Sequence, residues 1–356
     1  MATAMPINRA KLEAFAQKAI GDVGGTLTAL MCSLGDRLGL FKDLVTRGPA
    51  TSVELAARCA LQERYVREWL GQMAAAGYLE YDPGSSRFTL PPEHAAILAE
   101  ESGPMFLGGL YHFLPALVAP LERLIQAFRE GGGVHQAAYD ERFWEGLERF
   151  TGVGFENFLL QQWIPALPEL QRTLQRGALV ADVGCGTGRA LIKLAQAFPK
   201  SRYVGYDLHE PAVAKARAKA HAAGVSDRVN FTHLDVSKGL PDSYDLITTF
   251  DVVHDSVDPR GLLRAIRRAL KSDGTYLVQE INSQDRLEQN IGPLGAVKLG
   301  ASVLYCMTTS LANGGAGLGT IGLPESRLRE FCLEAGFQNV RRIWENPFRV
   351  VYEVRP

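Results

Sequence analysis

The sequence predicts an α/β protein whose C-terminal half folds as a doubly wound, Rossmann-like sheet behind a smaller helical domain. From Ala178 onward, β-rich runs alternate with amphipathic helices, the pattern of a parallel sheet. Within the first 100 residues the order is helix, turn, helix, hairpin, which is that of a winged helix. The length of 356 residues accommodates about two such domains.

The N-terminal domain is predicted to span residues 1–100. Apolar spacing over Lys11–Leu44 indicates two helices, with the break placed at Gly24 and Gly25. A capping-box pattern at Thr51–Glu54 begins the next helix, and Glu63–Ala76 forms the following one. The hairpin strands are expected at 78–81 and 87–90, on either side of an Asp-Pro-Gly turn.

The charge of this domain argues against DNA binding. Residues 1–100 hold 10 basic and 11 acidic side chains, and the whole chain has a net charge of -1. DNA affinity comes mainly from basic side chains that neutralise phosphates, and a surface with this charge balance has no excess of them. We therefore expect a dimerisation or substrate-covering module, and a homodimer.

A helical, aromatic-rich linker is predicted over residues 101–170, either as ordinary core or as a lid over an apolar acceptor. The third domain then covers residues 171–356. Its strands are expected at Ala178–Val183, Tyr203–Tyr206, Val229–Leu234, Tyr244–Phe250, Thr275–Ile281, Gln338–Ile343 and Phe348–Val354. The segment of about residues 285–322 is too long for an ordinary connection and is interpreted as a lid insertion.

Composition indicates a cytoplasmic protein without a disulfide framework or a metal site. The five cysteines are scattered and never form a C-x-x-C pair. The N-terminal residues lack the pattern of a secretory signal. The uncharged run Met105–Leu121 is short for a bilayer and is interrupted by His112, Pro115 and Pro120, so we expect no membrane span there.

A glycine-rich turn follows the first expected strand of the sheet. Asp182-Val183 leads into Gly184-Cys185-Gly186-Thr187-Gly188, and glycines there let a ligand approach the backbone closely. The spacing fails the G-x-G-x-x-G fingerprint of dinucleotide-binding proteins. An acid followed by G-x-G-x-G instead suits a nucleoside with an amino-acid tail and no pyrophosphate.

Two further acids end the next two expected strands. Asp207 is placed to accept hydrogen bonds from ribose hydroxyls, and Asp235 from an adenine amino group. Each could instead be a helix cap or a solvated loop residue. Leu208, Val236, Phe250 and Asp251, which adjoin the ends of these strands, complete the candidate cofactor site together with Asp182, Gly184, Cys185, Gly186 and Gly188.

These residues resemble the motifs of class I S-adenosylmethionine (SAM)-dependent methyltransferases. The resemblance implies a seven-stranded mixed sheet, with Asp182 or its loop near the methionine end of SAM, Asp207 at the ribose and Asp235 at the adenine. The whole chain also resembles a mycobacterial Rv2258c-type group with a winged-helix N-terminus, and Tyr305–Thr320 carries that closer similarity.

His254 is the candidate general base. It follows the fourth strand, and Asp258 and Pro259 resemble the N-cap and first residue of the next helix. The segment is similar to the His-Asp motif of plant small-molecule O-methyltransferases, which implies a base supported by Glu280. That family's second flanking acid is missing, because Ala316 and Gly317 follow the Gly314-Gly315 pair. A loop-packing or substrate-contact role for His254 stays open.

The sequence therefore favours methyl transfer from SAM to the oxygen of a hydrophobic or aromatic small molecule. Sulfur, nitrogen and carbon acceptors remain alternatives, because a thiolate or an amine needs little help from a base. A winged-helix DNA-binding regulator that senses SAM is the alternative from another class of protein.

Overall fold

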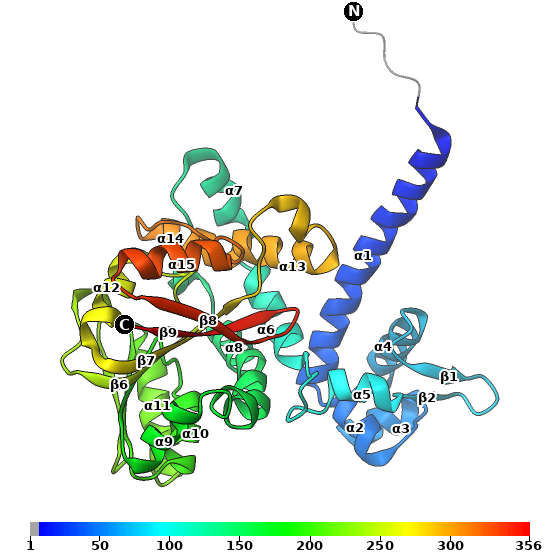
Figure 1. The fold of residues 1–356 in the computed structure, drawn as a ribbon. Coiled ribbons are helices and arrows are strands. Elements are labelled where there is room, and N and C mark those ends of the chain that lie inside the picture. Colours follow the sequence, from blue (N-terminus) through cyan, green and yellow to red (C-terminus); the bar gives the residue numbers. More distant parts are fainter. Residues whose placement is uncertain (1–6) are drawn as a thin grey trace, which may run out of the picture. The chain divides into compact units, whose positions relative to one another are not determined.

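A computed structural model describes residues 7–356, which divide into two compact units (Figure 1). Of the described residues, the first unit contains 7–116 and Asp140–Val153, and the second contains Leu117–Tyr139 and Gly154–Pro356. The helical segment expected as a linker over 101–170 is thus shared between the two units. Each unit is considered separately below.

The first unit contains the expected winged helix. Its helices are α1 (Arg9–Arg37), α2 (Leu40–Arg47), α3 (Ser52–Cys59), α4 (Glu63–Ala75) and α5 (Pro92–Leu98), and its hairpin pairs β1 (Glu80–Asp82) with β2 (Arg87–Thr89). The capping box is present as predicted: Thr51 accepts from the Glu54 N–H, and Glu54 accepts from the Thr51 N–H. The buried core includes Phe41, Trp69 and Leu70.

The predicted break at Gly24 and Gly25 is wrong. Helix α1 continues through both residues and ends at Arg37, where Gly39, with a φ of 72°, begins the turn into α2. A Cβ at Gly24 or Gly25 would contact nothing, so both glycines cost helix propensity without blocking the helix. The required glycine is Gly35, where a Cβ would lie 2.5 Å from the Trp69 ring.

The first unit also contains helices α6 (Gly108–Val118) and α8 (Glu141–Gly154). These two helices approach each other closely at glycine residues. A Cβ at Gly109 would lie 2.4 Å from the Phe150 nitrogen, and one at Gly146 would lie 2.7 Å from Phe113. Arg149 then joins α8 to α1 through a two-pronged pair with Asp36, at 2.7 and 2.9 Å. Part of the expected linker thereby packs within this unit.

The second unit is built on a seven-stranded sheet with the order β5-β4-β3-β6-β7-β9-β8. The strands are β3 (Leu179–Val183), β4 (Arg202–Asp207), β5 (Val229–His233), β6 (Tyr244–Phe250), β7 (Leu270–Ile281), β8 (Asn339–Glu345) and β9 (Arg349–Arg355). Strands β3 to β7 pair in parallel, and β9 runs antiparallel to both of its neighbours. The chain order reverses between β3 and β6, so that is the switch point where ligands bind in such sheets.

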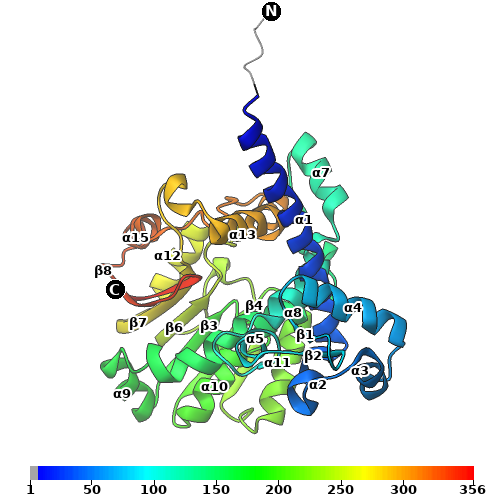
Figure 2. The same ribbon diagram turned by 90° about the vertical axis from the view of Figure 1, so that its right-hand side faces the viewer.

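Helices cover both faces of this sheet (Figure 2). One face packs on α9 (Pro168–Arg176), α10 (Arg189–Ala197), α11 (Glu210–Ala222) and the π-helical turn η2 (Phe155–Trp163); the other packs on α12 (Pro259–Ala269) and α15 (Glu325–Glu334). Successive residues of β3 alternate between the two cores: Val180 lies in one and Ala181 in the other. This alternation explains the continuous apolar character of the strand.

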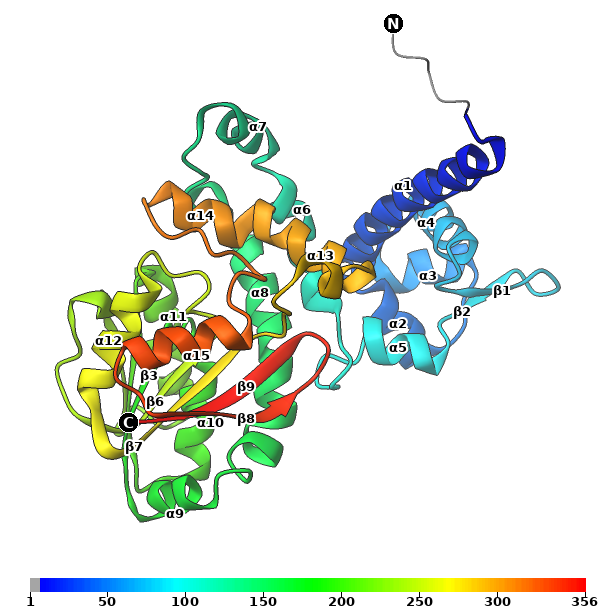
Figure 3. The same cartoon turned by 45° about the horizontal axis from the view of Figure 1, so that its top comes forward.

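The predicted insertion over about 285–322 is largely helical. It contains η4 (Leu287–Asn290), α13 (Pro293–Ala301), the π-helical turn η5 (Ser302–Cys306) and α14 (Met307–Ala312), and the last three form one continuous helix (Figure 3). By length and composition alone, Pro293–Ala312 could cross a membrane. Its contacts instead belong to the sheet unit: the Lys298 ammonium donates to the carbonyls of Asn282 and Pro347, and Ser310 donates to the Ser256 carbonyl.

The segment Leu117–Tyr139 of the second unit packs on the same insertion. It contains α7 (Leu121–Glu130) and the short helix η1 (Gln136–Ala138). The Val134 N–H donates to Thr308 Oγ1 at 2.9 Å, and the Tyr139 hydroxyl donates to the Leu304 carbonyl. A hollow beside α7, lined in part by Arg123, Glu130 and His135, includes none of the predicted site residues.

Candidate functional site

The glycine-rich turn lies at the carboxyl end of β3, beside the switch point. Gly184, Gly186 and Gly188 all have positive φ, at 72°, 52° and 78°. A Cβ at Gly184 would lie 2.5 Å from Val252, and one at Gly188 would lie 2.3 Å from Phe231. A Cβ at Gly186 would meet nothing within 4 Å. Packing therefore requires the outer two glycines, while Gly186 leaves open space at the turn. The Cys185 side chain is buried, so a ligand at the turn could reach only the backbone of this residue.

Asp207, at the end of β4, ties this turn to the neighbouring strand. Its Oδ2 accepts from the Gly186 N–H and its Oδ1 from the His209 N–H, both at 2.8 Å. Each oxygen keeps a second lone pair for a ligand hydroxyl. Leu208, the next residue, is 65% exposed and offers an apolar surface beside that carboxylate. The structure brings these two predicted residues together with the glycine turn.

Asp182 is buried below the turn and bonded to β6. Its Oδ1 accepts from the Thr248 hydroxyl at 2.6 Å. Burial raises the pKa of Asp182 to about 7, and the nearby Asp207 charge adds to the rise, whereas the Thr248 hydrogen bond opposes it. A carboxylate that titrates near neutrality can respond to a positive charge placed above it.

This pKa leads to a pH-dependent prediction. SAM carries positive charge on its sulfonium and its amino group, so we expect it to bind more tightly when Asp182 is ionised. Because the raised pKa is about 7, the affinity for SAM should increase as the pH rises from about 6 to about 8. Calorimetric titrations across this range would measure the change. The Asp182→Asn variant should lose the pH dependence, and an unchanged profile in that variant would contradict the assignment.

Asp235 caps a helix, which was the alternative considered from the sequence. It is the N-cap of the short helix η3 (Val236–Lys238): its Oδ1 accepts from the Ser237 N–H at 3.1 Å, and Lys238 lies 3.4 Å from its Oδ2. The Ser237 hydroxyl and the cap lower its pKa. Val236 is buried beneath it. A contact between Asp235 and adenine stays a prediction.

Phe250 and Asp251 end β6. The Phe250 ring packs edge-on against Phe155, with 5.0 Å between ring centroids, and stacks on Trp163, with 6.0 Å between ring centroids. Asp251 adopts a φ of 58°, uncommon for a residue with a side chain, and its Oδ2 pairs with Arg349 Nε at 3.0 Å. This strained residue turns the chain from β6 into the loop that carries His254.

His254 and Glu280 meet as the family resemblance implied. His254 Nδ1 lies 2.5 Å from Glu280 Oε2, and the Val253 N–H donates to Glu280 Oε1 at 2.8 Å. Both side chains are buried. Burial alone would lower the pKa of His254, but the carboxylates of Asp255 and Glu280 raise it well above its ordinary value. Burial raises the pKa of Glu280, and His254 opposes that rise.

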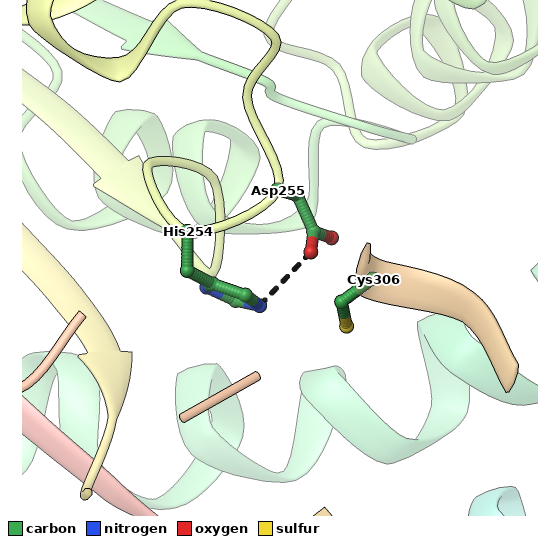
Figure 4. A group of neighbouring side chains, drawn as sticks. All are labelled: His254, Asp255 and Cys306. Atoms are coloured by element: carbon green, nitrogen blue, oxygen red, sulfur yellow. Dashed lines mark ion pairs between the residues drawn. The ribbon is translucent and has the colours of Figure 1, made fainter. Parts of the chain in front are cut away.

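Two neighbours of His254 were not singled out as site residues from the sequence. Asp255 Oδ1 lies 3.1 Å from His254 Nε2, and Cys306 of the π-helical turn η5 faces both residues (Figure 4). Burial raises the pKa of the Cys306 thiol to about 11. The His-Asp pair was visible in the sequence and could have indicated Asp255. Cys306 lies 52 residues from His254 in the sequence, and only the fold brings it there.

Comparison with known proteins agrees with this architecture. Residues 26–100 match the family described as Rv2258c-like winged HTH domain, and residues 174–301 match the family described as Methyltransferase domain. The chain is 29% identical over 146 residues to a ubiquinone biosynthesis O-methyltransferase of Pseudomonas savastanoi pv. phaseolicola, a match that covers 41% of this chain and 60% of that protein.

Longer similarities extend over both units. The chain is 26% identical over 319 residues to O-demethylpuromycin-O-methyltransferase of Streptomyces alboniger, covering 81% of this chain and 80% of that protein. The solved structure of the mitomycin 7-O-methyltransferase MmcR shares the fold, with a TM-score of 0.68 at 21% identity over 98% of this chain and 100% of that one. The chain is therefore a SAM-dependent methyltransferase in which an Rv2258c-like winged helix-turn-helix domain precedes a methyltransferase domain.

Proposed function

We propose that this protein transfers the methyl group of SAM to the oxygen of a hydrophobic or aromatic small molecule. The observation that carries the proposal is the meeting of His254 with Glu280 at the carboxyl ends of β6 and β7, on the same edge of the sheet as the glycine turn. The O-methyltransferase names of the relatives described above point the same way.

The residues at the glycine turn fit SAM. The open space at Gly186 would take the methionine portion, close to the carboxylate of Asp182. Asp207 would accept from the ribose hydroxyls with its free lone pairs, and exposed Leu208 would cover a face of the adenine. SAM supplies an electrophilic methyl group, so the chain must mainly orient the acceptor, exclude water and take up one proton.

His254 would take that proton. The base would be the neutral ring, in which Nδ1 donates to Glu280 and Nε2 carries a lone pair beside Asp255. Because the two neighbouring carboxylates raise the pKa of His254, a proton must leave Nε2 before the ring can act as a base. As the acceptor oxygen bonds to the methyl carbon and the carbon–sulfur bond breaks, the hydroxyl proton passes to Nε2. Asp255, 3.1 Å from Nε2, would then stabilise the imidazolium.

The helical insertion supports an apolar acceptor. Ala316 N–H donates to the Val257 carbonyl at 3.0 Å, and a Cβ on Gly315 would lie 2.7 Å from the Val257 Cα. The insertion thus packs directly on the loop after β6, and its long helix, Pro293–Ala312, is apolar. A wall of this kind beside His254 would exclude water and favour an apolar or aromatic substrate.

The charges of the winged helix do not favour the DNA-binding alternative. In α4, the helix that would enter a major groove, Arg64 pairs with Glu68 at 2.5 Å and Arg67 pairs with Glu63 at 2.5 Å. Arg87 of the wing pairs with Glu54 at 2.6 Å. Each of these cations would have to leave a carboxylate before it could neutralise a phosphate.

We propose instead that α1 mediates a homodimer. The N-terminal part of this helix exposes large apolar side chains: Leu12, Phe15, Ile20, Val23 and Leu27 are 53–68% exposed. An apolar helical stripe of this length indicates a protein partner, and a second copy could cover it with the same stripe.

The free cysteines of the described residues agree with a reducing cytoplasm.

The dimer can be tested by changing the stripe alone. We expect wild-type protein to sediment as a dimer and the Phe15→Lys/Ile20→Lys variant to sediment as a monomer, because two lysines cannot be buried across a symmetric apolar contact. The matched control replaces Lys11 and Lys18 on the same helix by Gln. A wild-type monomer would contradict the proposal.

The function itself is tested by finding the acceptor. The protein is incubated with methyl-labelled SAM and extracts of its source organism, and the labelled product is identified by mass spectrometry. We expect a labelled methyl ether of an apolar or aromatic compound. A label on nitrogen, sulfur or carbon would contradict oxygen as the acceptor atom. A salt-sensitive shift of genomic DNA in a gel, with no labelled product, would favour the DNA-binding alternative instead.

A further inference from the structure

We infer that His254, Asp255 and Cys306 form a binding site for a zinc ion, with the fourth coordination position open. One potential ligand atom from each residue, the imidazole Nε2, a carboxylate oxygen and the thiol sulfur, lies within 4.8 Å of the other two (Figure 4). Zinc prefers this mixture of nitrogen, oxygen and sulfur ligands.

The spacing of these atoms is close to that of a tetrahedral site. With zinc–ligand distances of about 2.0 to 2.3 Å, ligand atoms lie roughly 3.3 to 3.8 Å from each other. His254 Nε2 and Asp255 Oδ1 are 3.1 Å apart, so a small opening of this pair would admit the ion. Asp255 Oδ1 is buried and faces His254 Nε2, so a cation that replaces the Nε2 proton would find this oxygen in place as a ligand.

The surroundings of His254 are those of a metal-bound histidine. Such a histidine usually donates its other ring N–H to a carboxylate, which sets the tautomer and directs the lone pair at the metal. Glu280 accepts from His254 Nδ1 at 2.5 Å and is itself held by the Val253 N–H at 2.8 Å. Nε2 therefore faces Asp255 and Cys306, where a metal ion would take the place of the Nε2 proton.

The backbone around Cys306 adds an independent observation. The π-helical turn η5, Ser302–Cys306, interrupts an otherwise α-helical segment and ends at this cysteine. Such turns inside α-helices frequently occur at functional sites, because the extra residue changes the direction of a side chain. Asp255 keeps 28% of its side chain exposed, so one side of the cluster is open to a water molecule or an acceptor.

A bound zinc ion would change what His254 can do. Zinc would occupy the Nε2 lone pair that the proposed function assigns to the acceptor proton, so the metal-loaded protein should be a poor O-methyltransferase. This consequence depends on the proposed function, but metal binding does not. The test therefore measures binding in the absence of SAM and of any acceptor.

Cobalt(II) replaces zinc as the spectroscopic probe. We expect one cobalt ion per chain, with a thiolate-to-cobalt charge-transfer band in the near ultraviolet, and displacement of the cobalt by one equivalent of zinc. The Cys306→Ser variant should lose the band, and Asp255→Asn and Glu280→Gln should weaken zinc binding by roughly 10- to 100-fold. Cys59→Ser, which changes a cysteine of the winged helix, is the matched control and should behave as wild type.

Two results would overturn the site. One is the absence of a charge-transfer band in wild-type protein at tenfold excess of cobalt. The other is a band that persists in Cys306→Ser, whatever the result for Cys59→Ser. Circular dichroism on every variant separates loss of the site from loss of the fold. Because SAM takes no part in these measurements, a protein without methyltransferase activity could still bind zinc, and an active enzyme could fail to bind it.

Discussion

Replacing Gly186 by Val should weaken SAM binding by roughly 100-fold or more, which corresponds to about 2.7 kcal/mol. The reason is position: a Cβ at Gly186 meets no protein atom within 4 Å, so a valine side chain would project into the space that we assign to the cofactor. Its φ of 52° adds backbone strain, and its N–H is held by Asp207 at 2.8 Å. Isothermal titration with SAM and S-adenosylhomocysteine measures the loss.

The control for this change is Gly224→Val. Gly224 also has a positive φ, at 67°, and a Cβ there would also meet nothing within 4 Å. It lies in the turn between α11 and β5, at the edge of the sheet opposite the glycine turn. The control therefore carries similar backbone strain without the intrusion, and its affinity for SAM should stay near wild type. Equal losses in both variants would show that strain, rather than the site, is responsible.

Hydrophobic pattern was sufficient to predict the sheet. All seven strands were predicted from buried apolar runs between turn residues, and the largest error in a boundary is at β7, which begins at Leu270 instead of Thr275. That error has a physical cause, since Lys271, Ser272, Asp273 and Gly274 follow the turn pattern of a loop. In the sheet, Leu270 pairs with Tyr244 and Thr275 pairs with Leu246, so these four residues form an irregularity inside the strand. Local composition reports burial well and sheet register poorly.

The helical boundaries were harder to predict because glycine acts differently in different contexts. Gly24 and Gly25 suggested a break, but a helix tolerates both at a cost of about 1 kcal/mol each. Which glycine is indispensable depends on what a Cβ would meet, and for Gly35 that is the ring of Trp69, which lies in another helix. A contact of this kind exists only in the folded structure, so the local sequence does not reveal it.

The candidate site, too, was predictable where local sequence decides and unpredictable where the fold decides. The glycine turn and Asp207 were predicted because each ends a strand, and strand ends converge at the switch point. Asp235 caps η3, the alternative that the sequence left open, and its predicted contact with adenine stays a prediction. Cys306 could not have been found, because the insertion that carries it has no fixed register to the sheet until it folds. The role of Asp255 as a neighbour of Nε2 depends on the strained turn at Asp251.

Replacing His254 by Gln should slow O-methylation by roughly 100-fold or more while SAM affinity stays near wild type. Glutamine can still donate a hydrogen bond toward buried Glu280, so the variant removes the proton acceptor without leaving that carboxylate unpartnered. His254→Ala would be a poorer test, because losing the partner of a buried charge destabilises a protein by about 3–5 kcal/mol.

The measurement compares kcat of wild type and His254→Gln with the identified acceptor, in the presence of a metal chelator so that metal at Nε2 does not mask the effect. His221→Gln, an exposed histidine on α11, is the matched control and should keep full activity. Glu280→Gln should reduce kcat less than His254→Gln does, because it positions the ring and does not itself accept the proton. If His254→Gln turned over the acceptor at the wild-type rate, the ring would have no base role, and a thiol or amine acceptor, which ionises or attacks without assistance, would account better for the reaction.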